Sequence, residues 1–415
     1  ETIFSDGNGF ISGKTGIEKT FDNELRGKFG EKVYEVDARG KLLKEISSKN
    51  PEEGKNIFTS LDLGSHIAAN KALDGRMGAV VAIEIETGEI VTLFSSPSFS
   101  INDLSNGISR DKFNTLINSP QKPFFNRALK GRYPPASTIK PAIGIFGLEN
   151  KLIDWNFSIE DPGFFTLPED GRIYRGWKKG GHGKVNLNKA IVVSSNTYFF
   201  SLAYRSDINK LGDHFSQLGF GSKVCIDCFD EDPGLIPTPE WKRNKLNSGW
   251  SLGDTVNLGV GQGYMVATPI QLAYYSGMIA NKGFINKLSL IQNQEDSFSE
   301  LIALDNFKEL DWNKLHRAMT DVIDSPAGTS RRLQDLKSFK VAAKSGTAEL
   351  VSLDSKEDYL LIRENEEQRD HAIMIAFGPM PSPKYAVSVV IENGESGGAV
   401  AGPVAIEVLK ELIEQ

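Results

Sequence analysis

The sequence contains little cysteine and histidine, no long apolar run and no excess of basic residues. Two cysteines in 415 residues exclude a disulfide-dense scaffold, and the five histidines include no pair at the spacing of a helical zinc-protease motif. No stretch of about 18 apolar residues occurs, so we expect no transmembrane helix within the chain. The 47 Lys and Arg against 54 Asp and Glu give a net charge of −7, which argues against a nucleic-acid-binding protein.

The composition is otherwise that of a soluble globular protein, with 40% hydrophobic and 24% charged residues. The length favours two or three domains at about 150 residues each. Residues 1–58 are polar and have too few apolar clusters to form a core alone. The composition of the sequence changes at Thr59. Because the chain begins with Glu1 and no signal peptide precedes it, we expect a processed or truncated product whose natural form can carry a membrane anchor.

From Thr59 onward, the pattern predicts an α/β or α+β domain whose sheet is built from both ends of the chain, with a helical insert between them. Strands are predicted, the first two joined by a hairpin turn, at 78–85, 89–94, 339–350, 372–377 and 385–392. Helices are predicted at 137–149, at 187–204 with a break near 194–196, from Pro269 to before Gly283, from a cap at Asp311 to before Pro326, and at 402–414. The pattern predicts loops at 95–135 and irregular structure at 154–185.

A Ser-x-x-Lys spacing occurs three times, at 109–112, 119–122 and 137–140. Only the third lies at a loop-to-helix junction before an apolar helix, where Ser137 and Lys140 share a face. Burial or a nearby cation can lower the pKa of such a lysine until it accepts the serine proton, and a helix N-terminus favours a developing oxyanion. On this motif alone, the simpler hypothesis is that Ser137 only caps the helix.

Two further motifs stand out by their context. Ser-x-Asn recurs, but only Ser194–Asn196 is flanked by apolar helical sequence, where polar side chains must find partners or line a cleft. A turn with capping side chains is the alternative. Lys344-Ser345-Gly346-Thr347 follows a β run, and its lysine, hydroxyls and N–H groups suit an extended substrate with a carboxylate.

Two other patterns do not lead to a site. Gly394–Gly398 matches the Gly-x-Ser-x-Gly nucleophile elbow, but no histidine follows Ser396, as that enzyme class requires. Cys225 and Cys228 have redox-motif spacing without a thioredoxin-like context. Reduced thiols or a local disulfide are therefore favoured over a catalytic dithiol.

The motifs Ser137–Lys140, Ser194–Asn196 and Lys344–Thr347 occur in the order that serine β-lactamases and penicillin-binding proteins share. The chain resembles the class B penicillin-binding proteins over nearly its whole length, and in particular the elongation-specific D,D-transpeptidases of Gram-negative bacteria. Further matching stretches are Gly13–Glu18, Pro134–Pro141, Trp177–Gly183, Gly259–Tyr264, Ala267–Leu272, Lys344–Ala348 and Asp370-His371.

The resemblance implies the penicillin-binding transpeptidase fold, a central antiparallel sheet flanked by helices with a helical insert. It implies a remnant of a non-catalytic N-terminal pedestal domain at 1–58 and a transpeptidase domain at 59–415. The implied activity is cross-linking of peptidoglycan stem peptides ending in D-Ala-D-Ala, inhibited by β-lactams. A D,D-carboxypeptidase, a β-lactamase or a non-catalytic penicillin-binding sensor would carry the same motifs and remains an alternative.

The family's site roles fall on matching positions of this sequence. Ser137 would be the acylated nucleophile and Lys140 its base. Ser194 would relay a proton to the leaving D-alanine, and Asn196 would hold the donor peptide. The substrate carboxylate and oxyanion would face the Lys-Ser-Gly-Thr motif, that is Lys344, Ser345, Gly346 and Thr347, with the backbone N–H groups of Ser137 and Thr347 forming the oxyanion hole.

Some members of this branch hold a zinc ion with two Asp, one His and one Cys. The corresponding positions here are Asp161, Gly176, His182 and Ser195, so two donors are missing. A structural zinc site needs about four ligands, and we therefore expect neither zinc nor any other cofactor. His182 is expected to be a loop histidine bonded to backbone.

The resemblance also implies a location and partners. Family members sit in the periplasm, anchored in the inner membrane by an N-terminal helix that this sequence does not contain. Their partners in the elongation complex include a membrane glycosyltransferase and a scaffold protein. We expect both for the natural form of this chain.

Overall fold

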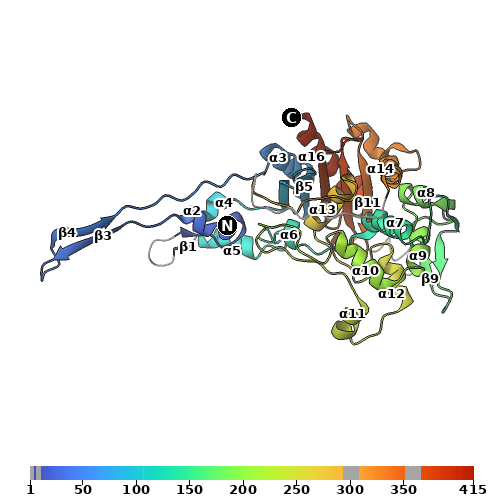
Figure 1. Cartoon of the computed structure of the whole chain (residues 1–415), viewed down its shortest axis with the longest axis horizontal. Coiled ribbons are helices and arrows are strands. Elements are labelled where there is room, and N and C mark those ends of the chain that lie inside the picture. The colour runs from blue at the N-terminus through green and yellow to red at the C-terminus, as the bar shows by residue number, and fades with distance from the viewer. Residues whose placement is uncertain (1–3, 6–10, 106, 293–307, 351–365) are drawn as a thin grey trace.

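The computed structural model describes residues 4–5, 11–105, 107–292, 308–350 and 366–415. Its centre is a five-stranded antiparallel sheet in the order β11-β12-β13-β5-β6 (Figure 1). These strands span Ala342–Ala348 (β11), His371–Gly378 (β12), Tyr385–Ile391 (β13), Gly78–Glu84 (β5) and Ile90–Ser96 (β6). The predicted joining of both chain ends is confirmed, because β5 pairs with β13, with Val81 opposite Ser388.

Alternating side chains of the sheet enter two different apolar cores, as the period of two along a strand requires. On one face, Val80 and Val387 pack with helices α3 (Leu63–Leu73) and α16 (Gly402–Glu414). On the other face, Val81 and Ile83 belong to the larger core that includes helix α13 (Pro269–Ala280).

Helix α13 is the central helix of the second face. Thr268 caps it in a reciprocal capping box with Gln271, and Pro269 occupies its first turn, as the sequence predicts. Every residue of the helix is buried, which explains its apolar sequence on all sides. The helical insert lies beside it (Figure 1), and its helices are α7 (Lys140–Glu149), α8 (Leu187–Val192), α9 (Asn196–Tyr204), α10 (Ile208–Gln217), α11 (Pro239–Leu246), α12 (Leu252–Leu258) and α14 (Glu309–Asp324).

The N-terminal residues form a small, open region that projects from the main body (Figure 1). It comprises β1 (Phe4–Ser5), β2 (Ile11–Ser12), α1 (Gly16–Thr20), α2 (Asp22–Arg26) and the hairpin of β3 (Glu31–Val36) and β4 (Leu42–Lys49). Every residue of β3 and β4 is exposed, which agrees with the prediction that this part holds no core of its own. Among the described residues, no helix is both long and apolar enough to span a lipid bilayer.

Three sequence predictions about local structure are wrong. Residues 95–135 are not all loop, because short helices form at α4 (Ile101–Ser105), α5 (Arg110–Ile117) and α6 (Arg127–Lys130), the last two behind side-chain caps from Ser109 and Asn126. Residues 154–185 include paired short strands at β7 (Ser158–Asp161) with β10 (Gly183–Asn186) and β8 (Phe164–Thr166) with β9 (Ile173–Arg175).

The third error concerns the start of helix α14. Asp311 does not cap it, because the helix begins two residues earlier, at Glu309. The Asp311 carboxylate instead accepts a hydrogen bond from the Trp155 indole at 2.8 Å. Of the two possibilities left open for the cysteines, Cys225 and Cys228 form a local disulfide.

Candidate active site

Ser137 lies in a single 3₁₀ turn, η1 (Ala136–Ile139), which runs directly into α7. The turn is held from outside, because the Ala136 N–H donates to Gly261 O at 2.8 Å while Ala136 adopts a left-handed φ of 51°. Ser137 is half-buried, and its hydroxyl makes no hydrogen bond with the residues that the structure describes. The capping hypothesis is therefore wrong, since Ser137 caps neither the turn nor the helix.

Lys140 is completely buried one turn after Ser137. Its ammonium nitrogen lies 2.6 Å from Asn196 Oδ1, 2.9 Å from Ser194 O and 3.1 Å from Ser194 Oγ. It also lies 5.6 Å from the centre of the Phe199 ring. These contacts join the Ser-x-x-Lys and Ser-x-Asn motifs, which are more than fifty residues apart in the sequence.

Ser194 lies where α8 ends and α9 begins, as the predicted break near 194–196 requires. Its backbone has a left-handed φ of 53°, which turns its side chain out of the helical path toward the lysines. Its neighbour Ser195 caps α9 by accepting from Tyr198 N–H at 3.3 Å. The capping alternative thus describes Ser195, whereas Ser194 and Asn196 contact Lys140.

Lys344 brings the third motif to the same point. It is completely buried on β11, and its ammonium nitrogen lies 2.9 Å from Ser194 Oγ and 2.9 Å from Ser345 O. Burial lowers the pKa of Lys344 to about 7. The pKa of Lys140 is lowered well below its ordinary value, first by burial and then by the positive charge of Lys344, while Asp161 opposes this shift.

Strand β11 lies against the Ser137 turn. Gly346 allows this close approach, because a Cβ atom there would lie 3.0 Å from Thr138 Cγ2 and 3.3 Å from Pro135 O. The hydroxyls of Ser345 and Thr329 are 3.2 Å apart, and Gln262 Nε2 donates to Thr347 O at 3.2 Å. The strand therefore presents its Lys-Ser-Gly-Thr backbone beside the free hydroxyl of Ser137.

The positions that correspond to the family's zinc ligands do not form a zinc site. Ser195 Oγ donates to Asp161 Oδ2 at 2.6 Å, and Gly176 has no side chain to offer. His182 lies in a loop, as the sequence predicts, and its main-chain N–H donates to Asp161 O at 3.1 Å. The predicted bond from the imidazole to backbone is not found at Nε2, which is buried and has no hydrogen-bond partner among the described residues. One carboxylate and one imidazole are too few for a structural zinc ion, so these residues do not fit the metal.

Four residues that contact the site received no role from the sequence. Trp177 donates its indole N–H to the backbone oxygens of Val193 and Ser194, each at 3.2 Å, yet the residue is 61% exposed. Gln262, Thr329 and Gly261 hold β11 or the Ser137 turn. The clustered glycines around Gly261 were the available signal, whereas nothing in the sequence distinguishes Thr329.

An antiparallel sheet covered by helices, with a Ser-x-x-Lys, a Ser-x-Asn and a Lys-Ser-Gly motif meeting at buried lysines, defines a penicillin-recognising serine enzyme. The family description "Penicillin binding protein transpeptidase domain" matches residues 78–410, and "Penicillin-binding Protein dimerisation domain" matches residues 5–59. The chain belongs to the class B penicillin-binding proteins, as the resemblance of its motifs predicts.

Relatives and solved structures agree with this membership. The chain is 39% identical to the peptidoglycan D,D-transpeptidase MrdA of Acinetobacter baumannii over 94% of this chain and 59% of the relative, and 34% identical to MrdA of Escherichia coli over 97% and 64%. It therefore spans about six tenths of the length of these relatives. A Pseudomonas aeruginosa PBP2 structure matches with a TM-score of 0.85 and 36% identity over 98% of this chain and 84% of that one. The structure of the Helicobacter pylori complex of PBP2 with MreC matches with a TM-score of 0.87 and 31% identity, over 100% of this chain and 76% of that one.

Proposed function

We propose that the chain is the catalytic part of a peptidoglycan D,D-transpeptidase of cell elongation. One observation carries the proposal: the lowered-pKa amine of Lys140 and that of Lys344 meet at Ser194 Oγ, beside the turn that presents the free hydroxyl of Ser137. The names of the relatives, peptidoglycan D,D-transpeptidases, support the same reaction.

In the first step, Ser137 Oγ attacks the carbonyl carbon between the two terminal D-alanines of a stem peptide. The neutral amine of Lys140 takes the hydroxyl proton, and its lowered pKa favours this neutral form. The backbone N–H groups of Ser137 and Thr347 receive the negative charge that forms on the carbonyl oxygen. The result is a tetrahedral intermediate that is covalently bound to Ser137.

In the second step, this intermediate collapses and D-alanine leaves. The proton on Lys140 passes through the Ser194 hydroxyl, 3.1 Å away, to the leaving amine. Lys344, Ser345 and Thr347 hold the terminal carboxylate during this step. Because Asn196 Oδ1 already accepts from Lys140, its amide N–H₂ remains for a carbonyl of the donor peptide. An acceptor amine then attacks the acyl-enzyme carbonyl and forms the amide cross-link, while the ester bond to Ser137 Oγ breaks and the proton lost by the amine returns to Ser137 Oγ.

The N-terminal residues 1–58 are the part that we assign to the pedestal domain, with 59–415 as the transpeptidase domain. Exposed apolar side chains follow the β3–β4 hairpin at Val36, Leu42, Leu43 and Ile46, each more than half exposed. Such a surface suits a protein partner. We assign to this region the contacts with the scaffold protein and the glycosyltransferase of the elongation complex. We place the domain in the periplasm and assign its natural form an anchor in the inner membrane. The H. pylori PBP2–MreC complex is the supporting precedent.

Intact-mass analysis after incubation with a β-lactam tests this function. We expect one adduct on the wild type, none on Ser137→Ala, and none on a folded Lys140→Ala variant. A missing wild-type adduct, or an adduct that survives Ser137→Ala, would refute the assignment. Rapid loss of the adduct with hydrolysed drug would instead favour a β-lactamase, and transfer of a stem peptide to water alone would favour a carboxypeptidase. A stable adduct without any cross-linking of stem peptides by the full-length protein would favour a sensor.

A further inference from the structure

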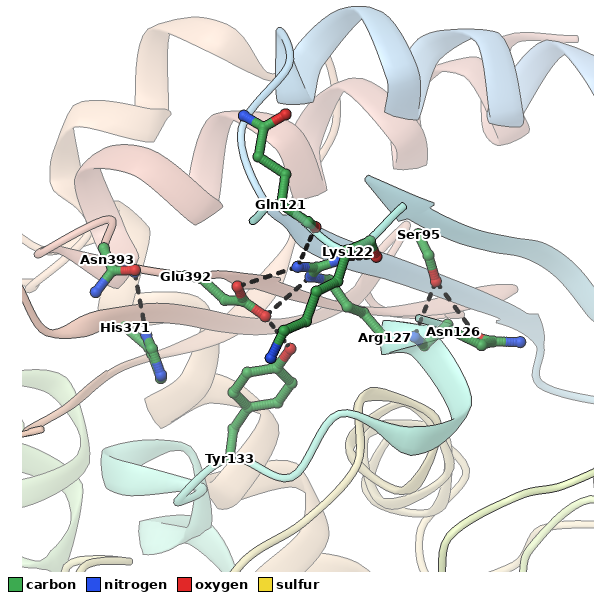
Figure 2. Close-up of polar contacts among 10 residues, drawn as sticks. Ser95, Gln121, Lys122, Asn126, Arg127, Tyr133, His371, Glu392 and Asn393 are labelled. Carbon is green, nitrogen blue, oxygen red and sulfur yellow. Dashed lines mark hydrogen bonds and ion pairs between the residues drawn. The ribbon is translucent and has the colours of Figure 1, made fainter. Parts of the chain in front are cut away.

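A buried charged network joins the segment that precedes Ser137 to the end of the central sheet. Figure 2 shows Arg127 and Tyr133 pointing toward Glu392, which directly follows β13. Arg127 Nε donates to Glu392 Oε1 at 2.9 Å, and the Tyr133 hydroxyl donates to the same oxygen at 2.7 Å. Arg127 is 2% exposed and Tyr133 is 4% exposed.

Each nitrogen of the Arg127 guanidinium donates a hydrogen bond. In addition to the Nε bond to Glu392, Nη2 donates to Gln121 O at 2.8 Å and Nη1 donates to Lys122 O at 3.2 Å. A buried ion pair of this kind contributes little net stability, because desolvation of both charges offsets their attraction. Its effect is geometric: it fixes where Tyr133 can lie.

The position of Tyr133 is passed to Ser137 through a short and stiff segment. The Tyr133 backbone pairs with Ala267 in both directions, at 3.0 Å and 2.8 Å. The two residues that follow are prolines, whose φ angles are fixed by their rings. Ala136 then takes its left-handed conformation, which persists only because its surroundings hold it.

Tyr133 also contacts the strand on the other side of the site. Its ring packs edge-on against His371, with ring centroids 5.4 Å apart. His371 begins β12 and pairs with Ala348, the residue that follows Thr347 on β11. His371 is itself fixed, since its Nδ1 accepts from Asn393 N–H at 3.1 Å (Figure 2). Tyr133 thus lies between the nucleophile segment and the end of β11.

We propose that Tyr133, held by Glu392 and Arg127, is a positioning residue that sets the placement of Ser137 relative to the Thr347 N–H. The proposal rests on the proposed function, because these two groups supply the nucleophile and part of the oxyanion hole. Tyr133 is 4% exposed and its hydroxyl is bonded to Glu392, so we assign it no contact with substrate. Its hydroxyl therefore governs the rate of acylation and not the initial binding of a β-lactam or the stability of the fold.

The test uses Tyr133→Phe, which keeps the ring against His371 and removes only the bond to Glu392. Stopped-flow acylation by a β-lactam over a range of concentrations separates the non-covalent binding constant from the acylation rate constant. We expect the rate constant to fall about tenfold or more, since small displacements of reacting groups have large effects on rate. The binding constant and the melting temperature should stay close to wild type.

Tyr204→Phe is the matched control, because it removes a tyrosine–glutamate hydrogen bond of the same length, 2.7 Å to Glu169, at an exposed site. It should acylate at the wild-type rate. Adding Tyr133→Phe to a Glu392→Gln background should slow acylation little further, since the bond is already weakened there. Equal acylation rate constants for Tyr133→Phe and wild type would refute the positioning role and leave the proposed function standing. A slower acylation that is accompanied by a lower melting temperature would also refute it, because the variant would then be destabilised as a whole. Absence of a wild-type adduct would refute the proposed function and this role with it.

Discussion

Lys140 and Lys344 meet at one hydroxyl, with Ser194 Oγ 3.1 Å from the first ammonium nitrogen and 2.9 Å from the second. Both lysines are completely buried, and Asp161 is the opposing charge that acts on Lys140. Two positive charges this close in a poorly solvated site disfavour each other. The arrangement therefore favours the neutral amine of Lys140, so the site has a base without a histidine.

The first prediction follows from the sign of these pKa shifts. Because a neutral Lys140 is the base, acylation should rise with pH as the lysine pair loses a proton, from well below the ordinary lysine value of 10.5. Lys344→Met removes the second cation, so the pKa of Lys140 should rise and the rising limb should move to higher pH. A pH profile of the acylation rate constant measures this. If the rising part of the pH profile does not move in Lys344→Met, burial alone lowers the pKa of Lys140.

The second prediction concerns the zinc positions. The wild type should hold substoichiometric zinc after purification and dialysis, because Ser195 and Asp161 satisfy each other and only His182 remains. The double variant Gly176→Asp with Ser195→Cys should bind about one zinc per chain, since it completes four donors. Gly176 has an ordinary φ, and a Cβ there would lie 3.2 Å from Gly163 O and 3.7 Å from Thr197 Oγ1, so the Gly163 backbone must shift slightly to admit the new side chain. Elemental analysis measures both, and near-stoichiometric zinc in the wild type would contradict the prediction.

The sheet and its main helices could be predicted because their signals are local. The apolar, β-rich runs of β5 and β6 are signals of this kind, and so are Thr268, Pro269 and Gly283, which mark the ends of α13. The motifs of the site were predictable for the same reason. The short helices in 95–135 were missed because their stability comes from caps and tertiary contacts and not from apolar periodicity.

The contacts that position the site could not be predicted, because they join residues far apart in the sequence. Trp177 meets the backbone of Ser194, and Tyr133 meets Glu392, through single hydrogen bonds. No spacing rule encodes such a pair. The convergence of Lys140 and Lys344 on Ser194 is likewise a property of the fold, since it requires β11 to lie beside the first turn of α7.

The third prediction uses a buried acid away from the site. Burial raises the pKa of Glu231 to about 7, against the backbone N–H groups of Val224 and Cys225, which favour its charged form. The folded state therefore binds more protons than the unfolded state between pH 4.5 and about 7. The contribution of Glu231 to the free energy of unfolding is therefore largest below this window and is lost as pH rises through it. The total loss is about 3 kcal/mol, at about 1.4 kcal/mol per pH unit.

Denaturant unfolding at pH 5 and pH 8, with the disulfide intact, measures the effect. Glu231→Gln should remove most of the difference between the two pH values. Glu240→Gln, at an exposed carboxylate, is the matched control and should leave the difference unchanged. If the free energy of unfolding falls equally between pH 5 and pH 8 in Glu231→Gln and in the wild type, Glu231 does not titrate in this window.

The last prediction tests how closely β11 must approach the nucleophile turn. In Gly346→Ala the new methyl group would lie 3.0 Å from Thr138 Cγ2 and 3.3 Å from both Pro135 O and Thr138 N, so either the strand or the turn must move by a few tenths of an ångström. Both elements carry groups that we place in the reaction, and a displacement of that size in reacting groups lowers rates strongly. We expect acylation by a β-lactam to fall about tenfold or more, with a loss of about 1 to 3 kcal/mol in unfolding free energy from overpacking. Gly249→Ala is the control, since nothing lies within 4 Å of its Cβ, and it should change neither quantity. Wild-type acylation by Gly346→Ala would mean that the two elements tolerate a looser fit than their contact distances indicate.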